Sequence, residues 1–328
     1  MPTSAPTLAA WFTDPSDADI ATQRRAVPAN VLQPPLSKDR LSHAVVGLGR
    51  FGSTHARKLA GLAGFRLRAV VDVSPAAQTS ADHAALPLLT SIDDLPADID
   101  SATVATPDAS HAELALALLR RGCHVLVEKP LCLAPHDGAL LLRAAHDHGA
   151  TLCTGHIERF NPLWNDALRE SLRAAAQDPL HRDDVALRFQ RSSGRSARAI
   201  DSVFDLMVHD LDLLAWLCAV PTDAPLQVVE RVLGRQGIRV RVRLGGVLAE
   251  LESGYADAPA SARLWARHGH AWQLLDLRDR TRAHPFDDDA LTRQYRAFHG
   301  AVRGKRGTIA TGADGLAAVT RAHQVVHG

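Results

Sequence analysis

The segment Gly47-Leu48-Gly49-Arg50-Phe51-Gly52 decides the fold. It follows the apolar run Ala44-Val45-Val46 and precedes a helix-like stretch over 53–62, and Asp72 ends a second apolar run twenty residues past the last glycine. The first glycine permits a tight turn, the second lets the backbone approach a pyrophosphate, and the third lets the helix pack on the sheet. This register predicts a dinucleotide site; the alternative is a glycine turn in an unrelated α/β protein.

The residue types around this loop also favour one of the two nicotinamide dinucleotides. Free N–H groups and the dipole at the start of the helix favour phosphates, so the loop residues Gly47, Gly49, Arg50, Phe51 and Gly52 are candidates for cofactor binding. An acid at Asp72 accepts ribose hydroxyls and repels a 2′-phosphate. Val73-Ser74-Pro75 supplies no arginine, although Ser74 can hydrogen-bond a phosphate. We therefore predict NAD over NADP.

Composition excludes several classes of partner. The chain has 328 residues, enough for two domains, and 37 Lys+Arg nearly balance 36 Asp+Glu, with no polybasic tract. Nucleic acid and anionic membranes are therefore not expected as partners. Neither a secretory signal nor an apolar stretch of the roughly 20 residues that a membrane span needs is recognisable.

Cysteine and histidine usage gives no sign of a metal. The four cysteines show no CxxC spacing, which favours reduced thiols and a cytoplasmic location. The closest histidine pairs among the seventeen, His146 with His148 and His268 with His270, lack clustered Cys or Asp ligands. We expect no metal site.

Hydrophobic patterning divides the chain into three parts. Residues 1–40 are rich in Pro and Ala and predict a partly disordered extension with at most one short helix. Residues 41–155 alternate strands with helices, which predicts a doubly wound parallel sheet, that is, a Rossmann domain. Residues 156–328 predict a second, α+β domain with a mostly antiparallel sheet and helices on one side of it.

The expected elements have the following bounds. Strands are predicted at 43–48, 66–72, 101–105, 123–127 and 151–155, and helices at 51–62, 75–84, 109–121 and 135–148. The second domain has strand-like segments at 184–191, 226–234, 238–244, 247–255, 261–268 and 271–277, and helices at 161–176, 203–218, 287–303 and 312–327. In segment 238–244 arginines alternate with apolar residues, which indicates an outward sheet face or a subunit interface.

Two predicted strands end in residues suited to chemistry. Thr106-Pro107, with His111 one turn later, follows one strand, and Glu128-Lys129-Pro130 ends another. Ligands of doubly wound folds bind at this carboxyl edge. A lysine there can polarise a substrate oxygen or help take its proton, so Lys129 is a catalytic candidate. An exposed loop lysine is the alternative.

A nearly all-apolar helix carries a narrow polar stripe. In 203–218 the polar residues are Asp205, His209, Asp210 and Asp212, and all but Asp210 fall on one stripe about 60° wide in an α-helix. Such a helix is buried, and buried carboxylates need partners. We predict a polar cavity in which His209 acts as general base and a carboxylate holds its tautomer. A structural network at the domain interface is the alternative.

Arginines ahead of that helix are candidates for anion recognition. Arg188, Arg191, Arg195 and Arg198 surround a Ser-Ser-Gly sequence, and guanidinium forks suit a diphosphate or a carboxylate. A solvated strand and loop is the alternative. Segment 155–162, GHIERFNP, opens the second domain, so Arg159 and Asn161 are expected to face substrate.

Taken together, these motifs resemble the Gfo/Idh/MocA oxidoreductases. The resemblance covers residues 42–328 and includes GLGRFGSTHARKLA, ATPDASHAELALALLRRGCHVLVEKPL, the DxxxHxxD of 205–212 and TGADGLAAV. It implies a nicotinamide domain, an open-faced sheet domain, a homodimer or homotetramer, and oxidation or reduction of a sugar or cyclic polyol. It also implies Lys129 as catalytic lysine, His209 as acid–base histidine and Asp205 as its helper.

Within that family, GHIERFNP with DLMVHDLDLL resembles the branch of UDP-N-acetylglucosamine 3-dehydrogenases. This resemblance implies oxidation of the C3 hydroxyl of a UDP-linked N-acetylamino sugar. It leaves two alternatives open: a dehydrogenase or reductase of the same fold for another polyol or an anionic ring compound, and a non-catalytic NAD-sensing protein. The predicted cofactor-binding residues outside the glycine loop are Asp72, Thr106, Pro107, His111, Glu128 and Lys129, and the predicted substrate-binding residues are Arg159, Asn161, Arg195, Arg198 and Asp212.

Overall fold

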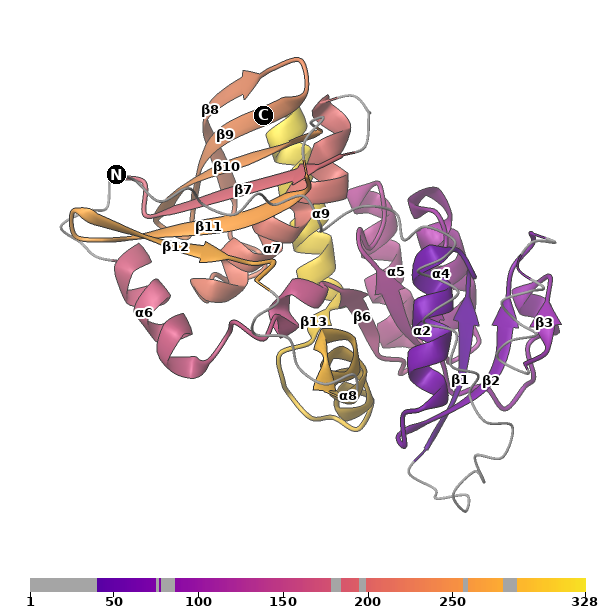
Figure 1. Cartoon of the computed structure of the whole chain (residues 1–328). Coiled ribbons are helices and arrows are strands. Elements are labelled where there is room, and N and C mark those ends of the chain that lie inside the picture. The colour runs from indigo at the N-terminus through magenta and orange to yellow at the C-terminus, as the bar shows by residue number, and fades with distance from the viewer. Residues whose placement is uncertain are drawn as a thin grey trace.

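Two β-sheets and a set of helices make up the protein (Figure 1). The computed structural model describes residues 40–74, 77, 86–177, 184–194, 199–255, 259–279 and 288–328. The expected extension 1–40 therefore lies, except for Arg40, outside the described residues, as does most of the helix expected at 75–84.

The first sheet has the order β13-β6-β5-β4-β1-β2-β3. All its neighbouring strands are parallel except β13, which pairs antiparallel with β6. Its strands are β1 (Leu41–Val46), β2 (Phe65–Val71), β3 (Leu88–Leu89), β4 (Ser101–Val104), β5 (His124–Glu128), β6 (Leu152–Gly155) and β13 (Ala310–Thr311). The helices α2 (Arg50–Ala60), α4 (His111–Arg120) and α5 (Pro135–Asp147) connect the parallel strands. This confirms the predicted Rossmann architecture.

Burial on both faces explains the continuous apolar strands of this sheet. Val45, Val125 and Leu126 have no exposed surface, and neither has Ala102 of β4. A parallel sheet covered by helices on both sides requires such sequences, because neither face meets water. Because β5, β4 and β1 are neighbouring parallel strands, their carboxyl ends lie side by side.

The second sheet has the order β12-β11-β7-β10-β9-β8 and is antiparallel except between β7 and β10. Its strands are β7 (Leu187–Ser193), β8 (Leu226–Leu233), β9 (Gly237–Leu244), β10 (Val247–Tyr255), β11 (Ser261–His268) and β12 (Ala271–Asp276). In β9 the apolar residues face the core, whereas Arg239 and Arg241 form ion pairs with Glu252 and Glu250 of β10. The alternation therefore marks an outward face.

Helices α6 (Asp166–Ala176), α7 (Val208–Leu217) and α9 (Gly312–His327) pack beside this sheet, and α9 also contacts α5 of the first domain (Figure 1). The predicted passage from one domain to the next at residue 155 falls where β6 ends. After the second sheet the chain returns to the first domain, because α8 (Ala290–Val302) packs against the core around Phe65 and β13 extends the first sheet.

Two predicted helices differ from the structure at their starts. The helix expected at 161–176 begins at Asp166, because the Asn165 side chain caps it by accepting a hydrogen bond from the Leu168 N–H. The helix expected at 203–218 starts with one π-helical turn, Val203–Met207, before α7 begins. This wider turn changes the angular positions of the polar residues, so Asp205 does not keep the α-helical spacing to Asp212.

None of the helices in the described part of the chain combines the length and hydropathy that a membrane crossing requires. All four cysteines are buried and free.

Candidate active site

The glycine loop after β1 has the geometry that its sequence predicts. Gly47 adopts φ +92°, a conformation that disfavours side chains, and a Cβ on Gly52 would lie 1.8 Å from the Gly47 carbonyl oxygen. A Cβ on Gly49, by contrast, would meet nothing within 4 Å. The backbone is therefore open at Gly49, where a pyrophosphate needs to approach, and closed at Gly52, where α2 packs.

Asp72 holds this loop against the end of β2. Its carboxylate accepts hydrogen bonds from the Leu48 N–H at 2.6 Å and from the Ser74 N–H at 2.7 Å. Gly49 forms the N-cap of α2 with no side-chain cap, and no acid occupies the first turn. The start of α2 thus offers uncapped N–H groups to a phosphate.

Two exposed residues lie at the start of α2. The side chain of Phe51 is 60% exposed, and the guanidinium of Arg50 lies 5.0 Å from its ring centroid. With the open backbone at Gly49 and the carboxylate at Asp72, the residues present fit a dinucleotide.

The loops after β4 and β5 are joined by His111. Its Nδ1 lies 2.7 Å from the Pro130 carbonyl oxygen and its Nε2 lies 2.9 Å from that of Thr106. The Thr106 hydroxyl accepts a hydrogen bond from Ser110, and Pro107 precedes a short 3₁₀ turn, Asp108–Ser110. The imidazole is buried, so it fixes the two predicted strand-end segments to each other.

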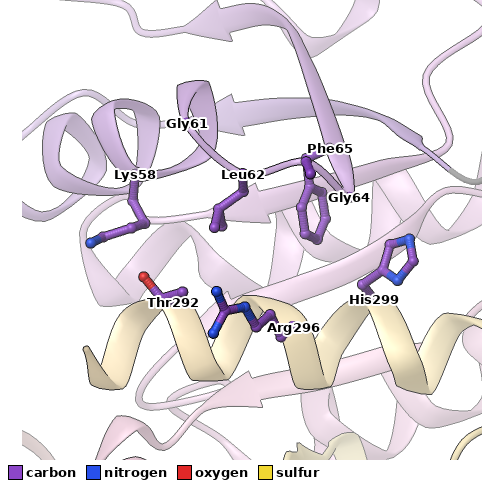
Figure 2. A pocket seen from close by; sticks show the side chains of 9 residues that line it. Lys58, Gly61, Leu62, Gly64, Phe65, Thr292, Arg296 and His299 are labelled. Atoms are coloured by element: carbon purple, nitrogen blue, oxygen red, sulfur yellow. The ribbon is translucent and has the colours of Figure 1, made fainter. Parts of the chain in front are cut away.

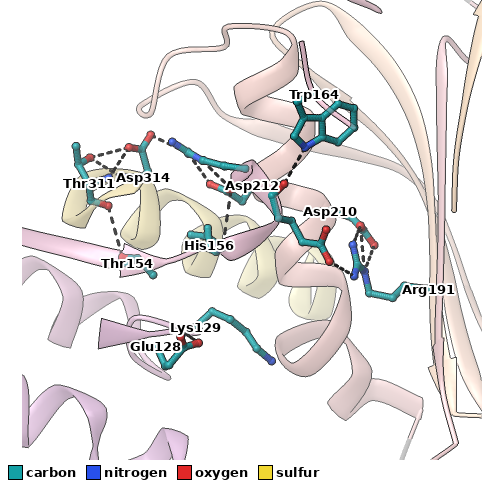
Figure 3. A network of polar contacts seen from close by, with 12 residues as sticks. Glu128, Lys129, Thr154, His156, Trp164, Arg191, Asp210, Asp212, Thr311 and Asp314 are labelled. Carbon is teal, nitrogen blue, oxygen red and sulfur yellow. Dashed lines mark hydrogen bonds and ion pairs between the residues drawn. The ribbon is translucent and has the colours of Figure 1, made fainter. Parts of the chain in front are cut away.

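Lys129 extends from the end of β5 toward the start of α7 (Figure 3). Its ammonium donates to the backbone carbonyl oxygen of Asp205 at 2.7 Å and to the Asp205 carboxylate at 3.1 Å. The other carboxylate oxygen of Asp205 accepts a hydrogen bond from the Tyr255 hydroxyl at 3.2 Å. The Lys129–Pro130 peptide bond is cis. The partly exposed ion pair between Lys129 and Asp205 thus joins the first domain to the second.

His209 lies one turn beyond Asp205. Burial lowers the pKa of His209 well below its ordinary value, and the nearby charges of Lys129 and Arg191 lower it further. The imidazole is therefore neutral at neutral pH. Its Nδ1 is buried and has no hydrogen-bond partner, and no hydrogen bond joins it to Asp205 in the described residues. The expectation that a carboxylate holds the tautomer of His209 is wrong for this structure, since Asp205 bonds Lys129 and Tyr255.

The other two acids of this helix, Asp210 and Asp212, pair with arginines (Figure 3). Asp210 and Glu158 bond Arg191, at 2.8 and 2.9 Å. Burial alone lowers the pKa of Arg191, but these carboxylates raise it overall. Asp212 forms a two-bond pair with Arg159, at 2.9 and 2.6 Å. The buried carboxylates are thus partnered, as their burial requires.

The predicted substrate-binding residues therefore separate into two groups. Arg159 and Asp212 bind each other and are buried, and the Asn161 side chain bonds the Leu277 carbonyl oxygen and the Leu163 N–H. Arg195 and Arg198 lie outside the described residues. In this structure Arg159, Asp212 and Asn161 thus make hydrogen bonds within the protein.

The sequence analysis missed a buried hydrogen-bonded chain behind Glu128. His55 bonds Glu128 at 3.0 Å and the Tyr295 hydroxyl at 2.7 Å, Tyr295 bonds Thr103 at 2.9 Å, and Thr103 bonds His43 at 2.9 Å. Burial raises the pKa of Glu128, but the hydrogen bond from His55 and the Lys129 charge lower it overall. Burial lowers the pKa of His43 to about 3.

Only part of this hydrogen-bonded network could be predicted from the sequence. His55 follows Gly52 by three residues, so its place near the loop was readable from the motif. Tyr295 lies 240 residues from His55, and no local pattern marks it.

One cavity lies apart from the site residues described above. Figure 2 shows a cavity of about 410 Å³ between the end of α2 and α8, and no predicted site residue lines it. In the described ranges, no group of three or more His, Cys, Asp or Glu side chains is arranged to hold a metal ion.

Comparison with known proteins gives a family match for the first domain. Residues 41–156 match the family GFO_IDH_MocA, described as an oxidoreductase family with an NAD-binding Rossmann fold. Residues 41–156 form a nucleotide-binding domain of the Gfo/Idh/MocA oxidoreductase type. The match covers the glycine loop, Asp72 and Lys129.

Two curated relatives are named for a nucleotide sugar and for a cyclic polyol. UDP-N-acetylglucosamine 3-dehydrogenase of Acidithiobacillus ferrooxidans is 33% identical over 183 residues, 55% of each chain. Inositol 2-dehydrogenase of Rhizobium meliloti is 31% identical over 182 residues, 53% of each chain. The chain thus matches these two relatives over about half of their length.

Solved structures extend the likeness of fold to the second domain. The Acidithiobacillus ferrooxidans enzyme has a TM-score of 0.72 at 24% identity, covering 87% of this chain and 96% of that one. A protein of gentamicin A biosynthesis, solved in complex with NAD, has a TM-score of 0.70 at 22% identity, covering 88% and 93%. At these identities the structures establish the fold.

Proposed function

We propose that the protein is an NAD-dependent dehydrogenase that oxidises the C3 hydroxyl of a UDP-linked N-acetylamino sugar. The observation that carries this proposal is the ion pair between Lys129 and Asp205, one turn from the neutral imidazole of His209, at the strand edge beside the glycine loop. A lysine and a neutral histidine at one place are the groups that removal of a hydroxyl proton requires.

Each residue has a distinct part in this proposal. His209 takes the hydroxyl proton, because burial leaves its imidazole neutral and its Nδ1 has no hydrogen-bond partner among the described residues. The Lys129 ammonium stabilises the negative charge that develops on the substrate oxygen, and Asp205 orients that ammonium at 3.1 Å. NAD, when bound, supplies the acceptor for the hydride.

The choice of sugar rests on the relatives and on the segment 155–162. The Acidithiobacillus ferrooxidans relative is named for UDP-N-acetylglucosamine. Its sequence identity to this chain, 33%, is slightly higher than the 31% of the inositol enzyme. A nucleotide sugar carries two phosphates, which makes Arg195 and Arg198 the proposed phosphate contacts. An inositol is the rival substrate, because the inositol 2-dehydrogenase match has nearly the same span.

Turnover on a substrate panel tests the proposal. We expect NAD reduction, followed by absorbance, with UDP-N-acetylglucosamine and none with inositols or with carboxylated ring compounds. NAD reduction with an inositol and not with UDP-N-acetylglucosamine would mean that the substrate is a polyol and not a nucleotide sugar. NAD binding without turnover of any panel member would make the protein a sensor.

Substitution at the lysine tests the mechanism. Lys129→Met should lower turnover at least about a hundredfold, because charge stabilisation at the reacting oxygen is lost. The exposed Lys305→Met is the matched control and should leave turnover unchanged. Near-normal rates in Lys129→Met would remove the lysine from the mechanism.

We further propose that the protein assembles as a homodimer or homotetramer. The outward face of the second sheet supports this, because the exposed side chains Val232 and Leu274 lie on it beside charged pairs. Light scattering that gives the mass of one chain would overturn the assembly.

A further inference from the structure

A second polar cavity lies between α6, α7 and α9, and its lining is rich in arginine. It has a volume of about 310 Å³. Its charged lining residues are Arg159, Arg169, Arg173, Arg321, Asp212 and Asp314. Lys129, Asp205 and His209 do not line it, so it is separate from the proposed active site.

The two carboxylates of this cavity are already committed to one arginine. Arg159 binds Asp212 at 2.6 Å and Asp314 at 3.3 Å. Asp314 in addition closes the capping box of α9 with Thr311. Four guanidinium groups therefore face only two carboxylates, and both carboxylates contact the same cation.

The remaining arginines bond mostly to neutral groups. The Nε of Arg173 donates to the Leu217 carbonyl oxygen at 3.4 Å, and Arg321 donates to the Pro221 carbonyl oxygen at 3.0 Å. Arg169 stacks on the Trp216 ring at 4.2 Å, and its ion pair, at 3.5 Å, is with a fully exposed aspartate. Each guanidinium has five N–H donors, so these bonds use only part of its capacity.

Arg321 is the strongest evidence that a ligand completes the cavity. It is 3% exposed, and its Nε is buried with no hydrogen-bond partner among the described residues. Burial lowers the pKa of Arg321, which Asp212 and Asp314 oppose. The Nε of Arg169 is buried and unpartnered as well. A buried cation with an unmade hydrogen bond is costly unless an anion meets it.

We propose that this cavity binds a phosphate dianion, either as inorganic phosphate or as the phosphate group of a small metabolite. Two negative charges match the excess of cations in the lining. Guanidinium forks from α6 and α9 can each bind two phosphate oxygens, which a single carboxylate cannot supply to both helices. The volume exceeds that of a phosphate group, and Trp216 gives an apolar wall for the rest of a small metabolite.

Binding would join α6 and α9 to the C-terminal end of α7 and therefore stabilise the fold. The full chain, saturated with NAD so that the glycine loop is filled, is heated with increasing inorganic phosphate at constant ionic strength. We expect the melting temperature to rise and saturate with phosphate but not with chloride. Absence of a phosphate-specific rise would overturn the proposal.

Variants locate the site. Arg173→Gln should weaken phosphate binding at least about tenfold, since hydrogen bonds to a charged group are lost. Arg321→Gln should do the same, and the half-buried Arg173 keeps the test valid if Arg321→Gln does not fold. The exposed Arg120→Gln, which removes the same charge elsewhere, should leave the affinity unchanged. Equal affinity in Arg173→Gln and Arg120→Gln would contradict this assignment.

A hexose phosphate, titrated in the same way, distinguishes the two sources of the ligand. Tighter binding than inorganic phosphate, lost in Arg173→Gln, assigns the cavity to a phosphorylated metabolite. Equal or weaker binding assigns it to inorganic phosphate.

Discussion

The loop after β1 and the helix α7 face the same strand edge, but they are built by different means. In the loop, backbone atoms and three glycines make the site, and the contacts join neighbouring strands, as when Asp72 accepts from the Leu48 N–H. In α7, buried side-chain charges make the site, and each finds its partner elsewhere in the chain: Asp210 with Arg191 and Asp212 with Arg159. The first region depends on the absence of side chains, the second on their pairing.

The largest expected effect tests the loop. In Gly52→Ala the new Cβ would lie 1.8 Å from the Gly47 carbonyl oxygen, so the backbone must move. We expect NAD binding to be lost in calorimetric titration. Gly307→Ala is the matched control: it lies outside the glycine loop, its Cβ meets nothing within 4 Å, and NAD affinity should be unchanged. Normal NAD affinity in Gly52→Ala would refute the close packing of α2.

The next effect tests α7. Asp210→Asn leaves the buried Arg191 with a single carboxylate partner, Glu158, and should lower the free energy of unfolding by about 3 kcal/mol in urea denaturation. The exposed pair of Arg68 with Asp98 gives the control, since Asp98→Asn should cost less than about 1 kcal/mol. Equal losses in the two variants would mean that burial does not distinguish these pairs.

This contrast explains how much of the molecule the sequence predicts. The strand–loop–helix unit, Asp72 and the strand-end position of Lys129 follow from local spacing. The partners of Asp210 and Asp212 do not, because Arg191 and Arg159 lie 19 and 53 residues away.

The position expected for Asp205 on the helix at 203–218 is wrong for a physical reason. An α-helical wheel assumes a constant spacing, and the π-helical turn at Val203–Met207 breaks it. The acid expected to orient His209 therefore binds Lys129.

A third prediction concerns pH and three buried histidines. The pKa values of His43, His156 and His209 are lowered by burial. The unfolded chain therefore takes up protons below about pH 6.5 that the folded chain refuses, and stability is full above that pH and falls below it. For His43 the loss, about 1.4 kcal/mol per pH unit, continues down to about pH 3.

Urea denaturation at several pH values measures this loss. His43→Gln should reduce the slope of stability against pH, whereas the exposed His148→Gln should leave it unchanged. Identical slopes for the two variants would contradict a neutral, buried His43.

The smallest effect sharpens the account of the loop. Asp72→Asn should weaken NAD binding about tenfold and reduce the preference over NADP, because the residue then no longer repels a 2′-phosphate. Affinities for both dinucleotides, measured by fluorescence titration, check this. An unchanged ratio of the two affinities would separate Asp72 from cofactor choice.

A crystal structure of the chain with bound NAD tests most directly whether the two regions form one site. The account predicts that the nicotinamide ring lies with the Lys129 ammonium and the His209 imidazole on one side of it, both able to reach the same substrate oxygen. A ring that lies elsewhere, or from which either residue is walled off, would contradict it.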